Sequence, residues 1–305
     1  MKPLYYCDHY AIPLPPGHKF PMRKYAMVRD ILSTGNTFTF VQADFASPDV
    51  IRLAHDSDYV DRFLAGTLDR AVIRRIGFPW SPGLVRRTLA SVGGSLAAAE
   101  DAMRHGWGGN LAGGTHHAFY GEGSGFCVFN DIAVIIRNLF AQGRIGRAAV
   151  LDLDVHQGDG TALLFEQDRA VLTVSMHGKN NFPFRKQKSS LDIELADGTG
   201  DDEYQQRLTE ALASVVAFKP DVIVYQSGVD GLTTDTLGRL SLTPEGLATR
   251  DRSVFTACRD LGCPVVVTLG GGYSNPLEST ALAHAATYRL AHAILGADGH
   301  RPMLL

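Results

Sequence analysis

The chain has 305 residues, 45% of which are hydrophobic, and its formal net charge at pH 7 is −3. A charge this close to neutral gives no support for bulk binding to nucleic acids or membrane surfaces, and no apolar run reaches the roughly 18 residues that a membrane helix needs. Because the N-terminus lacks an apolar signal core and the four cysteines lack a paired zinc spacing, we expect a cytoplasmic protein with reduced thiols and no nucleic-acid or membrane partner.

The N-terminal third of the chain predicts one strand and several helices. A strand is expected at Leu4–Cys7, followed by a loop rich in proline and glycine and by a helix that begins near Met22. Residues 55–78 are polar and partly helical. The clearest helix is Leu84–Arg104, because it is rich in alanine, follows a Ser-Pro pair and stops near a glycine.

Strands and helices alternate in the rest of the chain. A glycine-rich loop at Gly113–Gly125 precedes a helix at Cys127–Gln142. The strands expected after it are Ala148–Leu153, Ala170–Ser175, Val222–Gln226 and Val265–Leu269, and the helices are Asp202–Phe218, Pro244–Leu261 and Leu277–Leu295. This order predicts one α/β domain over residues 1–305, with three layers in which helices cover both faces of a mostly parallel sheet. Ligands of such sheets bind beyond the carboxyl ends of the strands.

The stretch Ala148–Gly160, AAVLDLDVHQGDG, places acidic residues where a buried strand should stay apolar. Asp152, Asp154 and His156 occupy alternate positions, so they share one face if the strand extends that far. Buried carboxylates are costly unless a partner compensates them, and a divalent cation would do so. The pattern fits neither a calcium loop nor a phosphate loop, which leaves a metal site and solvent-exposed acids as the two interpretations.

Two later strands also run into chemically active side chains. The strand Val222–Gln226 leads to Asp230, which could join Asp154 and His156 around one metal or could form an ordinary turn at a strand end. The strand Val265–Leu269 leads to three glycines and Tyr273, whose hydroxyl could stabilise an oxyanion. The glycine spacing does not match the dinucleotide-binding fingerprint.

Adjacent histidines, His116 and His117, lie in the glycine-rich loop. Histidine titrates near neutral pH, so the pair suits general acid–base catalysis, although two surface histidines would give the same pattern. Taken together, three metal ligands, two histidines and a tyrosine hydroxyl are the groups that metal-assisted amide hydrolysis requires.

Five motifs in this order resemble the histone deacetylase superfamily, which consists of zinc amidohydrolases with the arginase/deacetylase fold. They are GGTHHA, GFCVFND, LDLDVHQGDGT, the VD of SGVDGLTTDTLG, and GGGY. The resemblance covers about Tyr5 to Leu295. The segments GHKFPMRKY, RRIGFPWS and HGKNNFPFRK are similar to class IV members and their bacterial relatives.

The resemblance implies a role for each motif residue. Asp154, His156 and Asp230 would hold Zn²⁺, or Fe²⁺, and His117 would be the general base and acid. His116 would act electrostatically. Asp152 would be the partner of His116, and Asp159 would be the partner of His117. Tyr273 would donate a hydrogen bond to the carbonyl oxygen of the substrate.

The resemblance also implies a substrate channel and sites for structural K⁺ or Na⁺. The channel would be lined by Gly125, Phe126 and Gly271, with Phe182 or Phe184 opposite. An inner cation site would use Asp152, Asp154, His156, Ser175 and Met176, and an outer site would lie near Phe165, Asp168, Val171 and Tyr204.

The activity that the resemblance implies is hydrolysis of an acylated lysine side chain of a protein. A long-chain acyl-lysine or a small acylated amine such as an acetylpolyamine is an alternative substrate. An arginase-like ureohydrolase and a non-enzymatic acyl-lysine reader are disfavoured by Tyr273, and the reader also by His117. Two departures from the family pattern stand out: Gln157 replaces a second histidine, and the Arg75–Pro79 segment lacks the acid that several relatives use to grip the substrate backbone.

Overall fold

The computed structural model describes residues 1–296, so residues 297–305 of the predicted domain lie outside the described part. Its centre is one eight-stranded sheet, in the order β2-β1-β3-β8-β7-β4-β5-β6, and every neighbouring pair is parallel. The strands are β1 (Lys2–Tyr6), β2 (Phe38–Gln42), β3 (Trp107–Asn110), β4 (Ala148–Asp152), β5 (Val171–Gly178), β6 (Leu191–Leu195), β7 (Val222–Gln226) and β8 (Val265–Thr268).

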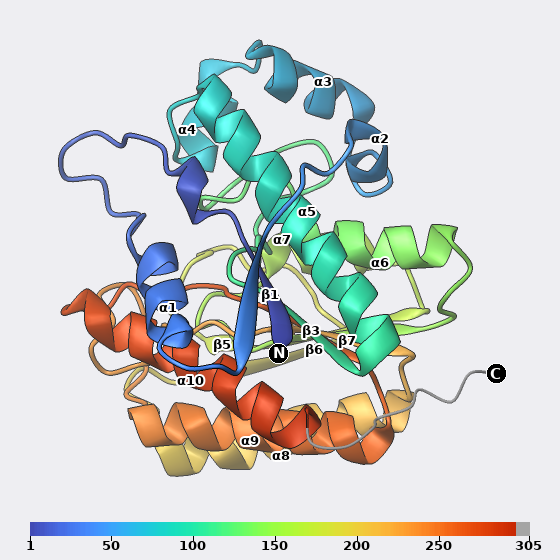
Figure 1. The fold of residues 1–305 in the computed structure, drawn as a ribbon, viewed down its shortest axis with the longest axis vertical. Helices are drawn as coiled ribbons and strands as arrows, with labels where there is room; N and C mark the ends of the chain where they lie inside the picture. The colour runs from blue at the N-terminus through green and yellow to red at the C-terminus, as the bar shows by residue number, and fades with distance from the viewer. Residues whose placement is uncertain (297–305) are drawn as a thin grey trace.

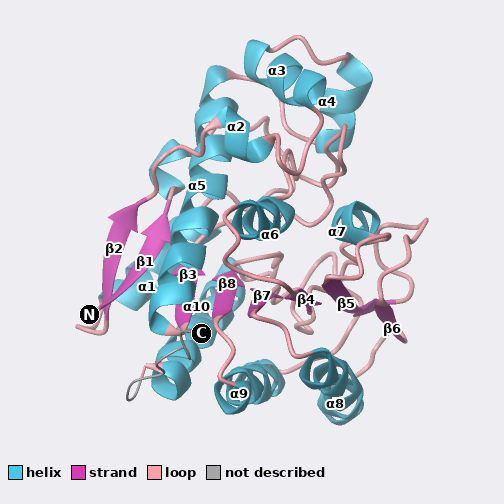
Figure 2. Cartoon of the chain, turned by 90° about the vertical axis from the view of Figure 1, so that its right-hand side faces the viewer, coloured by secondary structure: helices cyan, strands magenta, loops and turns pink. Residues whose placement is uncertain are grey.

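Helices cover both faces of this sheet (Figures 1 and 2). In chain order they are α1 (Lys24–Ser33), α2 (Pro48–Ile51), α3 (Ser57–Ala65), α4 (Arg70–Ile76), α5 (Pro82–His105), α6 (Asp131–Ala141), α7 (Asp159–Phe165), α8 (Asp201–Phe218), α9 (Pro244–Leu261) and α10 (Leu277–Leu295), with a short 3₁₀ turn at Asp8–Tyr10. The predicted three-layer α/β fold is therefore confirmed. None of the described helices is long and apolar enough to cross a membrane.

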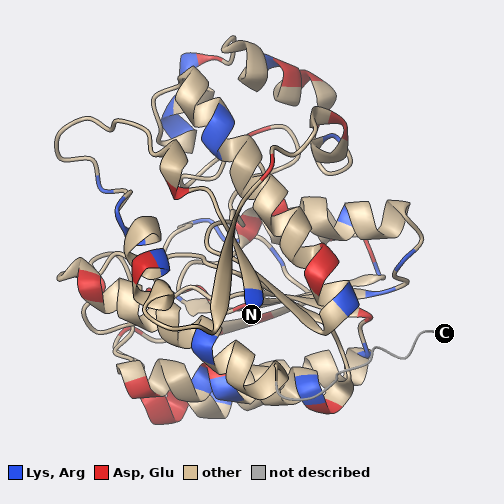
Figure 3. Cartoon of the chain, in the orientation of Figure 1, with Lys and Arg blue, Asp and Glu red and all other residues tan. Residues whose placement is uncertain are grey.

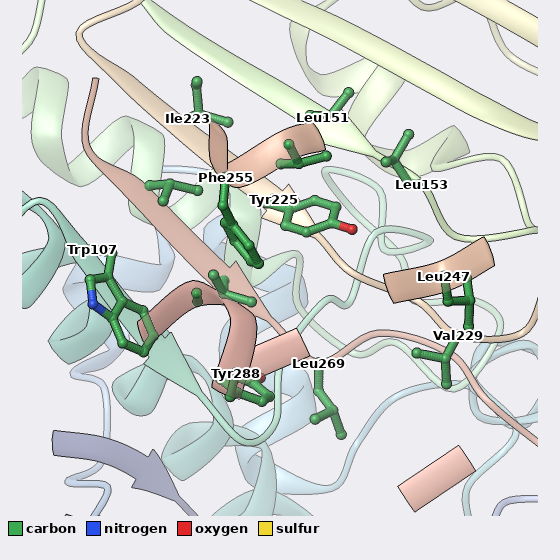
Figure 4. Close-up of a cluster of buried hydrophobic side chains, with 14 of the residues drawn as sticks. Trp107, Leu151, Leu153, Ile223, Tyr225, Val229, Leu247, Phe255, Leu269 and Tyr288 are labelled. Carbon is green, nitrogen blue, oxygen red and sulfur yellow. The ribbon is translucent and has the colours of Figure 1, made fainter. Parts of the chain in front are cut away.

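Two hydrophobic cores fill the space between the layers, and the central strands contribute alternate residues to each. In β4, Leu151 enters the core beneath α8, α9 and α10, whereas Val150 enters the core beneath α5 and α6. The first core is anchored by buried aromatic residues, including Trp107, Tyr225 and Tyr288 (Figure 4). Because both faces of the sheet are buried, the central strands are almost continuously apolar.

Several predicted boundaries are wrong. The helix expected at Cys127–Gln142 begins only at Asp131, because the side chain of Asn130 caps it by accepting a hydrogen bond from Ala133 N at 2.9 Å. The strands β2, β3 and β6 and the helix α7 were not predicted. The strand β4 ends at Asp152, so Asp154 and His156 lie in the loop beyond it and do not share a strand face.

Candidate active site

Three side chains converge beyond the carboxyl ends of β4 and β7. One ligand atom each from Asp154, His156 and Asp230 lies within 4.8 Å of the others. The Nδ1 atom of His156 is 3.0 Å from Asp154 Oδ1 and 3.1 Å from Asp230 Oδ2. Two carboxylates and one imidazole match the ligand set of a divalent cation that keeps open coordination positions.

Backbone amides hold these carboxylates in place. Gly271 N donates to Asp154 Oδ2 at 2.8 Å, and Val155 N donates to Asp230 Oδ1 at 2.9 Å. A β-carbon at Gly271 would collide with the carboxylate of Asp230, so only glycine lets this loop approach so closely. The two acids are therefore fixed before any ligand arrives.

The electrostatics of the cluster favour a cation. Asp154 and Asp230 are buried, and burial together with the charge of Asp154 raises the pKa of Asp230 to about 7. Burial lowers the pKa of His156, but hydrogen bonds to Asp154 and Asp230 outweigh it and raise the value to about 10. A divalent ion would relieve the repulsion between the two carboxylates, so these residues fit a metal.

Two histidine–aspartate pairs lie beside this cluster. The Nδ1 atom of His117 is 2.7 Å from Asp159 Oδ1, and the Nδ1 atom of His116 is 2.7 Å from Asp152 Oδ2. The imidazole centroids of His117 and His156 are 6.1 Å apart. The structure thus brings together both predicted pairs and the predicted metal ligands.

The two adjacent histidines have opposite ionisation tendencies. Burial and the neighbouring charge of His116 lower the pKa of His117 to about 4, although Asp159 raises it. Burial also lowers the pKa of His116, but Asp152 and Asp154 outweigh it and raise the value to about 9. These shifts favour a neutral His117 and a protonated His116 near neutral pH, and a separation of this kind suits acid–base catalysis.

The loop that carries both histidines is held from behind by residues to which the sequence analysis gave no role. Asp131 accepts hydrogen bonds from Gly114 N at 3.0 Å and from Thr115 N at 2.7 Å. Asn130 Nδ2 donates to Ala118 O at 3.2 Å. The signal for this role was two polar residues directly before an apolar helix, in a stretch of sequence that is otherwise apolar.

Tyr273 faces the same cavity from the loop after β8. Its backbone N donates to Asp235 Oδ2 at 2.6 Å, a positioning contact that sequence reasoning missed. Its ring stacks at 6.4 Å on Phe126, and burial raises the pKa of its hydroxyl well above the usual value. The hydroxyl therefore stays protonated, and it has no hydrogen-bond partner within residues 1–296, so it is free to donate to a ligand.

Aromatic side chains form the walls of a channel that leads to these groups. Phe126 lines one side, and the Phe182 ring lies 4.9 Å from that of His117 in an edge-to-face arrangement. Gly125 lies between His117 and Phe182, where a β-carbon would crowd both rings. Phe184 lies at the outer end and is 86% exposed. Of the two phenylalanines, the structure therefore places Phe182 beside His117.

The cavity has a volume of about 640 Å³ and continues past the histidines into a buried region. Its buried lining includes Tyr25, Leu84 and Val92, together with the side chains of Lys24 and Arg87. Lys24 Nζ donates to Gly270 O at 2.8 Å. Burial lowers the pKa of Lys24 to about 8, although nearby carboxylates including Asp230 oppose this shift.

The predicted monovalent-cation residues are only partly brought together. Asp152 and Ser175 are register partners on β4 and β5, with Met176 next along β5. Phe165, Asp168 and Val171 are linked by successive backbone hydrogen bonds of 2.9 and 3.1 Å. Tyr204 differs, because its side chain lies in the core on the α8 side of the sheet, whereas the side chains of Phe165 and Val171 lie in the other core.

Comparisons with known proteins agree with this geometry. Residues 18–290 match the family described as Histone deacetylase domain. An uncharacterized protein of Picosynechococcus is 41% identical over 296 aligned residues, which cover 96% of this chain and 99% of that protein. The acetoin utilization protein AcuC of Bacillus subtilis is 32% identical over 285 aligned residues, covering 84% of this chain and 73% of that protein.

A solved structure supports the fold independently. The crystal structure of the HDA15 HD domain is similar with a TM-score of 0.78 and 22% sequence identity, covering 99% of this chain and 90% of that one. From the family match and these relatives, the chain belongs to the histone deacetylase family.

Proposed function

We propose that this protein is a metal-dependent deacylase that hydrolyses N-acyl-lysine. Membership of the family implies a hydrolytic deacetylase in general terms. The observation that carries the finer proposal is the meeting of three ligands, a histidine–aspartate pair and a free tyrosine hydroxyl at one cavity. We propose Zn²⁺ as the metal, and Fe²⁺ is also compatible with the ligand set of Asp154, His156 and Asp230.

The side chains divide the reaction between them. Asp154, His156 and Asp230 would hold a divalent cation, which would supply Lewis acidity toward the amide carbonyl and water. His117, oriented by Asp159, accepts the water proton at Nε2 and returns it to the departing amine. His116, held protonated by Asp152, places positive charge near the developing negative charge. Tyr273 donates a hydrogen bond to the carbonyl oxygen as it becomes an oxyanion.

A longer acyl chain is a second candidate substrate. The cavity continues into a buried region lined by Tyr25, Leu84 and Val92, which offers apolar surface beyond the space that an acetyl group fills. A binuclear ureohydrolase is less well supported, because the described residues contain one cluster of metal-ligating side chains, Asp154, His156 and Asp230.

An acyl-chain series tests the proposal. One peptide, carrying acetyl-, octanoyl- or myristoyl-lysine, is incubated with the Zn²⁺-loaded protein, and release of the free amine is measured. We expect hydrolysis that a chelator abolishes and that added Zn²⁺ restores. The ratio of kcat/KM values across the series identifies the preferred chain length. If the metal-loaded protein cleaves none of these amides, the proposed function is wrong.

Replacing Asp159 with asparagine tests the role of the His117–Asp159 pair. The variant should bind metal normally but show a kcat roughly 10–100-fold lower, because an amide cannot stabilise the imidazolium ion. Because the carboxylate raises the pKa of His117, its loss should also move the acid limb of the pH–rate profile to lower pH. The control is Asp221→Asn, since Asp221 accepts backbone hydrogen bonds from Gly146 and Arg147 instead. Wild-type turnover in Asp159→Asn would exclude the pair from the mechanism.

A further inference from the structure

The mouth of the cavity is lined by arginines. Arg74 and Arg75, in the last turn of α4, and Arg239, in the loop after β7, all line it and are exposed. Figure 3 shows basic positions on α4 at the upper end of the molecule. Among the described residues that line this cavity, Asp154 is the single carboxylate, and it belongs to the proposed metal site. The outer part of the cavity therefore offers a substrate cationic side chains and no acidic one.

Hydrogen bonds join the segments that carry these arginines to the channel walls. Gly125 N donates to Arg75 O at 3.1 Å, and Phe126 N donates to Ile76 O at 2.8 Å, so the end of α4 is joined to the wall that Phe126 forms. On the opposite side, Asn181 Nδ2 donates to Leu237 O at 2.8 Å. This contact joins the loop of Phe182 to the loop that carries Arg239.

The positive charge at the mouth is only partly neutralised. Arg75 is 2.6 Å from Glu122, and Arg239 is 3.2 Å from Asp197, and both ion pairs are exposed to solvent. Arg74 forms no ion pair within residues 1–296, and neither does Arg185, which follows the exposed Phe184. Exposed ion pairs are weak, so a carboxylate on a substrate can compete for Arg75 and Arg239 as well as bind Arg74.

We propose that this mouth selects acyl-lysine in an acidic segment of a protein, with Asp or Glu close to the modified residue. The proposal rests on the proposed deacylase function and names its substrate class. A substrate carboxylate within a residue or two of the acyl-lysine can reach Arg74, Arg75 or Arg239 when the acyl chain enters the channel. A tail rich in Lys and Arg, or a polyamine, brings like charges to the same place and is disfavoured.

The test uses three acyl-lysine peptides that differ only in the flanking residues, which are acidic, neutral or basic. We expect kcat/KM to fall in that order, with an acidic-to-basic ratio of roughly tenfold at low ionic strength, because a few exposed charge pairs each contribute a few-fold. The ratio should arise mainly in KM and should approach one in about 0.5 M salt, where such charges are screened.

A charge-reversal variant connects the preference to the arginines. In the double variant Arg74→Glu/Arg239→Glu, the basic peptide should become the better substrate. The matched control is Arg207→Glu on α8, where Arg207 pairs with Glu210, and it should leave the ratio unchanged. If the glutamate variants fold poorly, Arg74→Gln/Arg239→Gln should bring the ratio close to one.

Two results would overturn this proposal: a wild-type ratio near one or in favour of the basic peptide, and a ratio that charge reversal does not alter. The ratio compares two peptides on the same enzyme, so it is independent of overall turnover. If no peptide is cleaved, the deacylase function fails, and binding of the same peptides to the metal-loaded protein, measured by fluorescence anisotropy, still decides the charge preference.

Discussion

Replacing Asp230 with alanine is expected to remove most of the bound metal and, with it, the activity. The variant loses one of three ligand side chains, and Val155 N loses its hydrogen-bond acceptor. Changes to groups that only orient metal ligands typically weaken metal binding by about 10–100-fold, so loss of a ligand should weaken it by at least about 100-fold. Metal analysis after gel filtration and a competition titration with a chromophoric chelator measure the change.

Two further variants separate metal loss from unfolding. Asp230→Asn keeps the side-chain shape and an oxygen for Val155 N, so it should fold normally while still binding metal weakly. Asp202→Ala removes an exposed acid from the first turn of α8 and should keep both metal and activity. Stoichiometric, tightly held metal in Asp230→Ala would show that the triad is not the metal site.

Replacing Tyr273 with phenylalanine should lower kcat by about 10²–10³-fold while folding and metal content stay unchanged. The ring and its packing against Phe126 remain, and only the hydroxyl that donates to the oxyanion is lost. Because this hydrogen bond is stronger in the transition state than in the ground state, kcat and kcat/KM should fall together and KM should change little. Steady-state kinetics on the preferred acyl-lysine peptide measure the effect.

The matched control is Tyr288→Phe, which removes a buried hydroxyl outside the cavity. Tyr288 Oη donates to the buried Asn110 O, so its loss should lower the free energy of unfolding by about 1–3 kcal/mol and leave kcat almost unchanged. The two variants therefore distinguish a hydrogen bond that stabilises the fold from one that serves catalysis. Activity close to wild type in Tyr273→Phe would falsify the mechanism proposed here even if the metal site is correct.

The central strands could be predicted from the sequence because both of their faces are buried in apolar surroundings. The strand β7 was predicted with its observed bounds, since a strand buried on both faces is a short apolar run between turns. The parallel order then places the ends of β4, β7 and β8 at one edge of the sheet. That is why residues after three separate strands could be assigned to one site.

Other elements depend on contacts that the sequence does not reveal. The strand β3, with the sequence WGGN, was missed because glycine is a poor strand former. Its glycines are explained by packing, because a β-carbon at Gly108 would collide with the carbonyl of Ala98 in α5. The roles of Asp131 and Asp235 also depend on tertiary contacts. Their carboxylates accept hydrogen bonds from backbone amides of other loops, and nothing in the sequence identifies those loops as their partners.

The candidate metal-binding residues show how a prediction can bring residues together through incorrect local geometry. Asp154 and His156 were expected to share a strand face, but the strand ends before them. Their convergence with Asp230 depends instead on hydrogen bonds from Val155 N and Gly271 N, which join segments more than 70 residues apart. Alternation along a strand could not have specified those contacts.

Because β4 lies between β7 and β5, the candidate active site depends on assembly of the whole sheet. The candidate site combines residues that follow β4 and β7 with the histidine loop and Tyr273. These segments meet only when long stretches of intervening chain have closed into loops. Closing those loops costs chain entropy, and this cost is offset only by the contacts that form when the sheet assembles as a unit. A partly folded intermediate that lacks the central strands also lacks part of the candidate site, so we expect activity to be lost together with the global fold.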